Sequence, residues 1–349
     1  MRLIGIDENG YGPILGPLVV TSTSLKLKSR NFTSVPDLWQ LLGIKKDPGS
    51  NSKRLLVCDS KMVFNTSRKK ELAAEETVLA FFYLCFGFVP ESADQFLKTL
   101  LNHSHSILQK HIPEVPIATY NPLCFCWKKE LNLGLNPERR RHILQSAEKL
   151  RKRAKQKGVT LEKPCCLLLC PSLFNTGLKN RNKSGLVLEA GLNLLRSHSD
   201  DEPFLAWLGK VGGLRYYQEH ISALFGPQCT VTPTREKKTD SAYELNKAGK
   251  TAGRITYLQD GEENSFLIAL SSFFGKYARD LFWKKTRTYL EELLPSSPPY
   301  LPPHLHPLPQ GERKHASGYR DSLTKLFIKE TEEVRKKLNI PDDCFLRRK

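Results

Sequence analysis

The sequence opens with MRLIGIDENGYGPILGPLVV, residues 1–20, and this stretch decides how the rest of the chain is interpreted. Its short apolar run, Leu3–Ile6, contains β-branched residues and predicts a buried strand. Two acids, Asp7 and Glu8, follow directly, and a glycine-rich turn follows them. A buried carboxylate is costly unless it is paired, and the glycines let the backbone approach a ligand closely. The pattern therefore predicts either a metal site or a solvated strand end with a tight turn.

The order of residues around the acidic pair also resembles a known family. The motif GIDENGYGP, residues 5–13, with Gly16-Pro17 after it, closely resembles the opening signature of type 2 ribonucleases H. That family usually has Ala in place of Asn9 and often has Arg in place of Tyr11. Its members cleave the RNA strand of RNA–DNA hybrids with two divalent metals held by four carboxylates. The resemblance implies that Asp7 and Glu8 are catalytic metal ligands.

A second motif lies between a short apolar run, Arg54–Cys58, and a strongly predicted helix, Arg68–Phe86. It reads Asp59-Ser60-Lys61, and the family has Asp-Ser-Lys at the corresponding place. The resemblance implies that the Ser60 hydroxyl and the Lys61 ammonium group bind phosphate. Alone, the tripeptide is a common turn.

A third motif, GKYARD at residues 275–280, ends a helix predicted from Ser265 to Trp283. The family has a similar ending on the helix that follows a strand and a Gly-Asp step, so Ser272, Lys276 and Arg279 are implied to contact phosphates. Counting back by the family spacing places Glu262 at the third metal-ligand position. Asp260 competes with it, because Asp260 also follows a predicted strand.

The fourth acid of the family has no counterpart in this sequence. The best match to its strand is WLGKVGG, residues 207–213, which places Gly209 at the acid position. Glu236 or Asp240 could reach the site from a neighbouring strand instead. The missing acid favours a catalytically impaired nucleic-acid-binding protein, whereas the intact Asp7-Glu8 pair favours an enzyme.

The resemblance also implies contacts with the sugars of the substrate. Gly10, Tyr11 and Gly12 form the turn that senses the ribose 2′-hydroxyl in the family, and the glycine backbone groups could still do so here. Tyr319 follows Gly318 before a late predicted helix, and the family's Tyr at that place packs on a sugar. A tyrosine in the core is the alternative interpretation.

The charge of the chain predicts a polyanionic partner. Lys and Arg number 54 against 36 Asp and Glu, which gives a formal net charge of +18 over 349 residues. Such an excess indicates nucleic acid, although a basic soluble surface would show it too. Many of these cations lie in a helix predicted at Asn136–Lys157, which is either a solvated face or a surface that follows a duplex backbone. We expect an RNA–DNA hybrid as partner and a monomeric protein.

Cysteine usage and hydropathy predict a reduced, cytoplasmic protein that does not enter a membrane. The chain has nine cysteines, and Met1 leads into the first strand without a signal-like segment. No apolar stretch reaches the roughly 18 residues of a membrane span. Cys124-x-Cys126 and the cysteines of 165–170 lack the paired spacing of a zinc site, so we expect core thiols.

These patterns predict an α/β fold, with the mixed sheet of the ribonuclease H type flanked by helices. The first strands are expected to be antiparallel and the later ones parallel and linked by helices. Residues 1–290 are expected to form this domain, with a helical insertion at about 90–200. A proline-rich crossing segment and a C-terminal helical extension, Ser322–Leu338, then occupy 291–349, and residues 347–349 are expected to be frayed. Pro164–Cys170 predicts a central strand, and Phe174–Lys183 a polar loop.

The resemblance therefore implies a metal-dependent endonuclease, with Mg²⁺ or Mn²⁺ held by Asp7, Glu8 and Glu262 in a two-metal site. Two other hypotheses remain open. One is a non-catalytic nucleic-acid-binding protein on the same fold. The other is a basic RNA-binding protein unrelated to this family, whose binding would not depend on Asp7.

Overall fold

The computed structural model describes residues 1–28, 35–49, 54–64, 66–111, 124–198, 202–294, 316 and 318–348. The predicted proline-rich segment, Pro295–Pro309, lies outside these residues.

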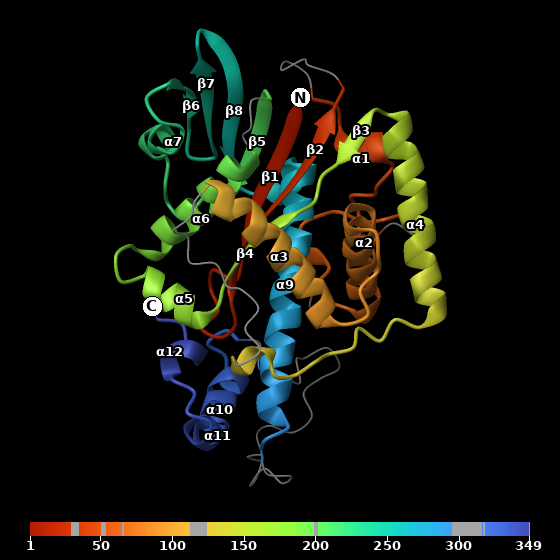
Figure 1. The fold of residues 1–349 in the computed structure, drawn as a ribbon, viewed down its shortest axis with the longest axis vertical. Coiled ribbons are helices and arrows are strands. Elements are labelled where there is room, and N and C mark those ends of the chain that lie inside the picture. Colours follow the sequence, from red (N-terminus) through yellow and green to blue (C-terminus); the bar gives the residue numbers. More distant parts are fainter. Residues whose placement is uncertain are drawn as a thin grey trace.

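The described chain contains a mixed sheet in the order β3-β2-β1-β5-β8-β7-β6, with β4 also paired to β2 (Figure 1). Its strands are β1 (Arg2–Asn9), β2 (Leu18–Leu27), β3 (Val159–Leu161), β4 (Cys165–Leu169), β5 (Phe204–Gly209), β6 (Cys229–Glu236), β7 (Asp240–Lys247) and β8 (Lys250–Leu258). Strand β1 is antiparallel to β2 and parallel to β5, which is parallel to β8. The predicted mixed sheet, antiparallel at first, is confirmed. Its second edge, β8-β7-β6, is an antiparallel meander.

Helices cover both faces of the sheet, as predicted (Figure 1). The helices are α1 (Leu38–Leu42), η1 (Ser60–Met62), α2 (Arg68–Phe86), α3 (Ala93–His111), η2 (Phe125–Trp127), α4 (Pro137–Gln156), α5 (Pro171–Gly177), α6 (Lys183–His198), α7 (Gln218–Phe225), α8 (Gly261–Asn264), α9 (Phe266–Glu291), α10 (Ser322–Glu330), α11 (Glu332–Lys337) and α12 (Asp342–Phe345). Helices α2, α4 and α9 pack in the core on one face, and α6 and α7 pack in the core on the other.

Strand β1 separates these two cores because its side chains alternate between the faces. Leu3 belongs to the core of α9, whereas Ile4 and Ile6 belong to the core of α6. Continuing the alternation, Asp7 emerges on the α9 face and Glu8 on the α6 face. The acidic pair thus straddles the end of a strand that is buried on both sides.

Helix α9 lies directly on β1, and Gly5 makes this possible. A Cβ at residue 5 would lie 2.2 Å from the carbonyl carbon of Leu267, so only glycine fits between strand and helix. The Ser271 hydroxyl donates a hydrogen bond to the Gly5 carbonyl oxygen at 2.8 Å. This close approach fixes the helix that carries Ser272, Lys276 and Arg279 relative to the acidic pair.

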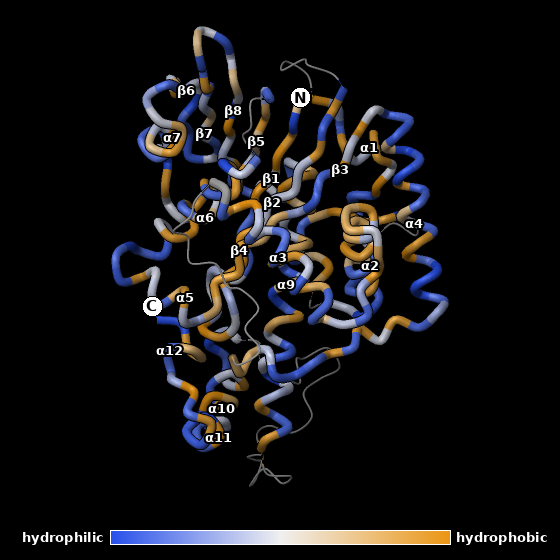
Figure 2. Tube along the Cα trace, viewed as in Figure 1, coloured by the Kyte–Doolittle hydropathy of each residue, from blue (hydrophilic) through white to orange (hydrophobic). Residues whose placement is uncertain are grey.

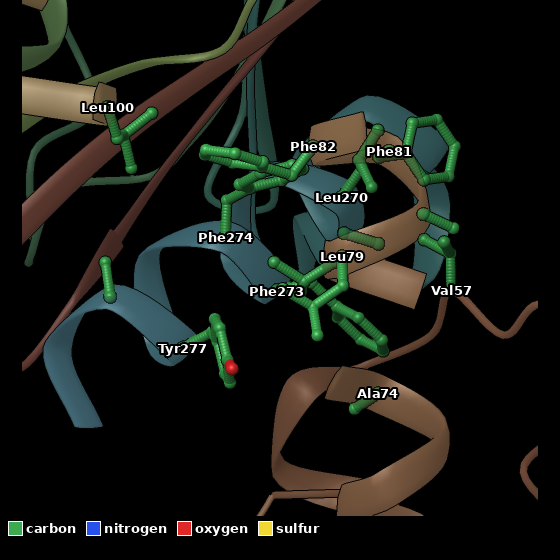
Figure 3. Packing of buried hydrophobic residues seen from close by; sticks show 14 of the residues in the cluster. Val57, Ala74, Leu79, Phe81, Phe82, Leu100, Leu270, Phe273, Phe274 and Tyr277 are labelled. Atoms are coloured by element: carbon green, nitrogen blue, oxygen red, sulfur yellow. The ribbon is translucent and has the colours of Figure 1, made fainter. Parts of the chain in front are cut away.

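On its outer side α9 packs against α2 through aromatic side chains. Figure 3 shows Phe273 and Phe274 of α9 in one buried cluster with Phe81 and Phe82 of α2. The predicted bounds of α2 are confirmed, and Ser67 is its N-cap residue, although its side chain makes no capping hydrogen bond. Because α2, α3 and α4 share one core with α9, these helices are continuous with the body of the protein. The division at residue 290 stays a prediction.

Helix α4 contains most of the expected basic stretch and is mainly hydrophilic along its length (Figure 2). Several of its cations have structural partners. Arg139 pairs with Glu75 at 2.6 Å, and Arg153 donates hydrogen bonds to the carbonyl oxygens of Gln40 and Leu41. These contacts attach two cations of the helix to the body of the protein, and the choice between a solvated face and a duplex-binding surface stays a prediction.

Two local predictions were wrong in part. The strand predicted at Pro164–Cys170 forms as β4 (Cys165–Leu169) and is buried. It is not central, because within the described residues it pairs only with β2, and helices cover it. The expected loop at Phe174–Lys183 begins inside α5, which starts at Pro171 and buries Phe174. Within the apolar run Arg54–Cys58, Leu56 forms a parallel bridge with Lys45.

The C-terminal extension is helical, as predicted, but its predicted single helix is divided at Thr331 into α10 and α11. Phe327 and Phe345 pack with Leu15 and Trp283 in a third core cluster. The expected frayed tail is also wrong for Arg347, which is 5% exposed.

All nine cysteines are free thiols. Cys124 and Cys126 lie with their sulfurs 3.1 Å apart. Among the described helices, none combines the length and hydropathy needed to cross a bilayer.

Candidate active site

A cleft of about 1320 Å³ opens where the parallel strands β1, β5 and β8 end. Carboxyl ends of parallel strands meet at one edge of a sheet, and ligands commonly bind there. Asp7, Glu8 and Gly209 line the cleft, as do Asp260 and Glu262, which follow β8. Three motifs that are far apart in the sequence are therefore brought together.

Gly209 lies beside the acidic pair, at the position where the resemblance to type 2 ribonucleases H implies a fourth carboxylate. A Cβ at Gly209 would be 3.3 Å from Asp7 Oδ1 and 3.5 Å from Glu8 Oε2. The two carboxylates thus converge on one point from opposite faces of β1. The space beside them is free because residue 209 has no side chain.

Neither proposed substitute reaches this point. The Glu236 carboxylate accepts a hydrogen bond from the Tyr243 hydroxyl at 2.6 Å, and Asp240 pairs with Arg235. Neither acid is part of the cleft lining. The suggestion that Glu236 or Asp240 replaces the acid at Gly209 is therefore wrong.

Glu262 is the third acid of the group. Its Oε2 accepts a hydrogen bond from the Ser60 backbone N–H at 2.7 Å, and its charge raises the pKa of both Asp7 and Glu8. Asp260 is exposed, at a backbone φ of 52° immediately before α8. Of the two competitors, Glu262 is the acid that interacts with the pair.

The three acids share an environment that disfavours their charge. Burial, Glu262 and Glu8 raise the pKa of Asp7 well above its usual value. Burial, and to a smaller extent Glu262, raises the pKa of Glu8 to about 7. Burial also raises the pKa of Glu262. Lys61 provides one compensating cation: burial lowers its pKa, but Asp59, Glu262, Asp7 and Asp260 together raise it above the usual value.

Two serines lie between these acids instead of facing the solvent. Ser60 and Ser272 are 4% and 1% exposed, and the Ser272 hydroxyl donates to the Ser60 hydroxyl at 2.9 Å. Hydrogen bonding by Ser272 lowers the pKa of both Asp7 and Glu262. The pair orients carboxylates, a role that the phosphate-binding prediction did not include.

Asn9 is a further residue whose role the sequence did not reveal. Its amide Nδ2 donates to Asp7 Oδ2 and to the Ser272 carbonyl oxygen, both at 3.3 Å. Gly275 permits this contact, since a Cβ there would lie 2.8 Å from Asn9 Nδ2. The available signal was the departure from the family's Ala at this position.

The glycine turn lies at one side of the cleft. Gly10 has a φ of 91°, and a Cβ there would lie 2.7 Å from Arg279 Nε. The Tyr11 hydroxyl shares a hydrogen bond with Ser184 at 3.0 Å, while Gly12 is exposed. The ring of Tyr319, which is 48% exposed, would lie 3.1 Å from a Cβ at Gly12.

The cations expected from α9 reach the same cleft. Lys276 pairs with Asp280 at 2.8 Å, and the buried Arg279 contacts Asp280 at 3.2 Å. Lys61, Lys276, Arg279 and Tyr319 all line the cleft with the acids. Every residue that the sequence selected for the site, other than Ser272, lies in this lining, and Ser272 is directly beneath it.

The donors suit a hard divalent cation in chemistry. Mg²⁺ commonly takes one or two carboxylates and completes its shell with water and substrate phosphates. Asp7 and Glu8 converge on one point, and a cation would relieve their raised pKa values. As the side chains lie, no group of three or more His, Cys, Asp or Glu within the described ranges is arranged to hold a metal ion. Glu262, bonded to Ser60, stands apart from that point.

Comparisons with known proteins match structures only. No protein-family profile and no curated protein sequence matches the chain. One similar solved structure is the complex of PCNA and RNase HII from Archaeoglobus fulgidus, at 13% identity over 99% of this chain and 94% of that one, with a TM-score of 0.41. Another is ribonuclease H2 from Pyrococcus horikoshii OT3, at 13% identity over 99% and 92%, with a TM-score of 0.40. Because both TM-scores are below 0.5, function is inferred from the residues of the cleft.

Proposed function

We propose that the protein is a divalent-metal-dependent endonuclease that hydrolyses the RNA strand of RNA–DNA hybrids. The observation that carries the proposal is that Asp7 and Glu8 converge on one point in a cleft that Glu262 and the Ser60-Lys61 step also line. These residues come from the three motifs that resemble type 2 ribonucleases H.

In this proposal Asp7 and Glu8 hold Mg²⁺ or Mn²⁺, and Glu262 completes the acidic group. The bound cations would activate water as the nucleophile and stabilise charge on the leaving oxygen. Gly209 supplies no carboxylate, so water or substrate would take that place in the two-cation mechanism of the family. Ser60, Ser272 and Asn9 hold the carboxylates in position through the hydrogen bonds described above.

The remaining residues would bind the hybrid. Lys61, Lys276 and Arg279 present cations along the cleft, which suits the phosphates of a nucleic-acid backbone. The backbone groups of Gly10 and Gly12 would contact the ribose 2′-hydroxyl that distinguishes RNA from DNA. Tyr319 offers a half-exposed ring against which a sugar could pack.

A second candidate is a binding protein on the same fold that does not cleave. Two observations favour it, namely the missing carboxylate at Gly209 and the hydrogen bond that turns Glu262 toward the Ser60 backbone. This candidate predicts hybrid binding that is sensitive to salt and indifferent to divalent metals.

A substrate panel separates the two candidates. Purified protein is mixed with an end-labelled RNA–DNA hybrid, a DNA duplex of the same sequence and single-stranded RNA, each with Mg²⁺, Mn²⁺ or a chelator. The proposal expects cutting of the RNA strand of the hybrid alone, and only with metal. Tight hybrid binding without cutting under any condition would support the non-catalytic candidate.

A further inference from the structure

The C-terminal tail contributes a buried arginine behind the glycine turn. The Arg347 backbone N–H donates to the Ile14 carbonyl oxygen at 2.9 Å, and Leu346 forms an antiparallel bridge with Leu15. Asn175 of α5 holds the tail on its other side, through its Nδ2 to the Leu346 carbonyl oxygen at 2.7 Å. The last described residues are therefore fixed against the segment that follows the acidic pair.

Arg347 and Arg279 are two buried guanidinium groups with unused donors. They are 5% and 3% exposed. Arg347 donates through Nη2 to the Pro13 carbonyl oxygen, and Arg279 donates through Nη1 to Asp280. Within the described residues, Nε and Nη1 of Arg347 and Nε and Nη2 of Arg279 are buried without a hydrogen-bond partner. Four guanidinium nitrogens thus lack an acceptor among the residues that the structure describes.

The surroundings of Arg347 and Arg279 are positively charged. Burial, and then the charge of Arg279, lowers the pKa of Arg347 to about 9. Burial lowers the pKa of Lys183, and Arg347 and Arg320 lower it further. The ammonium group of Lys183 lies 4.3 Å from the ring centroid of Tyr11, so it stands beside the turn as well. Asp280 is the acid that contacts this group of cations in the described structure.

A purely structural role does not account for this arrangement. The Pro13 bond and the Phe174 ring, whose centroid lies 4.9 Å from the guanidinium carbon of Arg347, would hold the turn. They still leave most donors of both buried guanidinium groups unused, which is unfavourable. An anion would satisfy the donors and offset the repulsion. Guanidinium groups bind phosphate oxygens in pairs, with good geometry.

We propose that Arg347, together with Arg279, forms an anion pocket behind the Gly10–Gly12 turn, and that its ligand is a phosphate group of the nucleic-acid backbone. This inference deepens the proposed function and rests on it for the identity of the ligand. Arg279 lines the cleft and meets the phosphate directly. Arg347 supplies the second charge, so the C-terminal tail is part of the binding site.

The pocket is tested first with inorganic phosphate, without any need for catalysis. Thermal unfolding is followed in increasing phosphate at constant ionic strength maintained with chloride. A ligand that binds only the folded protein raises the melting temperature with its concentration. The wild type and Arg348→Gln, whose exposed side chain pairs with Asp343, should both show this rise. Arg347→Gln should lose it, and Arg347→Lys should keep part of it.

The second arm uses an RNA–DNA hybrid with the Asp7→Asn protein, so that the substrate stays intact. Adding Arg347→Gln should weaken hybrid binding roughly tenfold, as expected for a charged hydrogen bond, and should make binding less salt-dependent. Stabilisation by phosphate without any change in hybrid affinity would mean a free-phosphate site and overturn the assignment to a backbone. Equal phosphate responses in wild type and Arg347→Gln, with both folded, would overturn the pocket itself. Because the phosphate arm needs no cutting, a failure of the proposed nuclease activity would be seen separately.

Discussion

Gly209 faces Asp7 across the ends of two parallel strands, and a Cβ added to Gly209 would lie 3.3 Å from Asp7 Oδ1. This relationship explains why the acidic residues lie together at the strand ends and why the site lacks one carboxylate. The strand ends meet as they would in a four-carboxylate centre, yet one of the four side chains is absent. The chain therefore offers an unusually direct test of what the missing acid contributes.

Gly209→Asp should strengthen metal binding. The new carboxylate would enter the space beside Asp7 and Glu8, and cation affinity increases with the number of charged ligands. We expect Mn²⁺ affinity, measured by calorimetry, to rise roughly tenfold or more. Gly209→Asn fills the same volume without charge and is the matched control. A gain that is equal in both variants would contradict the electrostatic explanation.

The metal-free protein should lose stability as the pH rises through the titration of Glu8. Its pKa is raised from 4.5 to about 7 by burial, so the folded state holds the proton more tightly than the unfolded state. The free energy of unfolding must then fall as the pH increases between these two values. Melting temperatures from pH 4 to pH 8 in chelator measure this slope, and Glu8→Gln should flatten it.

The raised pKa values of Asp7 and Glu8 also predict how metal stabilises the protein. Adding Mn²⁺ should raise the melting temperature more at pH 8 than at pH 5, because the acids are then charged and the cation offsets their repulsion. A metal effect that does not change with pH would indicate binding elsewhere on the protein.

Ser272→Ala should impair catalysis with little loss of hybrid binding. The Ser272 hydroxyl is buried and acts on Asp7 and Glu262 instead of facing the cleft. Loss of groups that orient metal ligands typically costs ~10–100-fold in metal affinity or activity. Rates at saturating hybrid, as a function of Mn²⁺ concentration, measure the effect. A phosphate-binding role would instead weaken hybrid affinity and leave the metal dependence unchanged.

Gly5→Ala should prevent the normal packing of α9 on β1. A Cβ there would lie 2.2 Å from backbone, so the helix must move, at a cost of at least ~3 kcal/mol in the free energy of unfolding. Gly213→Ala is the control, because nothing lies within 4 Å of its Cβ position and its effect should be within ~0.5 kcal/mol. Denaturant unfolding of both variants gives the comparison.

The sequence predicted well wherever one local pattern decided the structure. The apolar, β-branched run Leu3–Ile6 and the helical spacing of Arg68–Phe86 were enough to place β1 and α2. The sequence failed where partners from distant segments decide the outcome. Strand β4 looked central because it is apolar, but its burial comes from helices. Arg347 looked like a frayed end, because nothing local indicates that Ile14 and Asn175 will hold the tail.

The same distinction applies to the site. The acids and cations were recognised from motifs, and Glu262 from its spacing to GKYARD. Their hydrogen bonds could not be predicted, because Ser60, Ser272 and Asn9 meet only after β1, η1 and α9 have packed together. The choice between Glu262 and Asp260 likewise depended on packing, because Glu262 bonds to the Ser60 backbone N–H whereas Asp260 is exposed.

The most direct test is the rate of RNA-strand cleavage in a hybrid with Mn²⁺, compared across wild type, Asp7→Asn and Glu263→Gln. Glu263 is exposed next to Glu262 and serves as the matched acidic control. We predict that the wild type and Glu263→Gln cut at similar rates, whereas Asp7→Asn falls below about 1% of them because the metal geometry is lost. Cleavage that survives in Asp7→Asn, or its absence from all three folded proteins, would contradict the account.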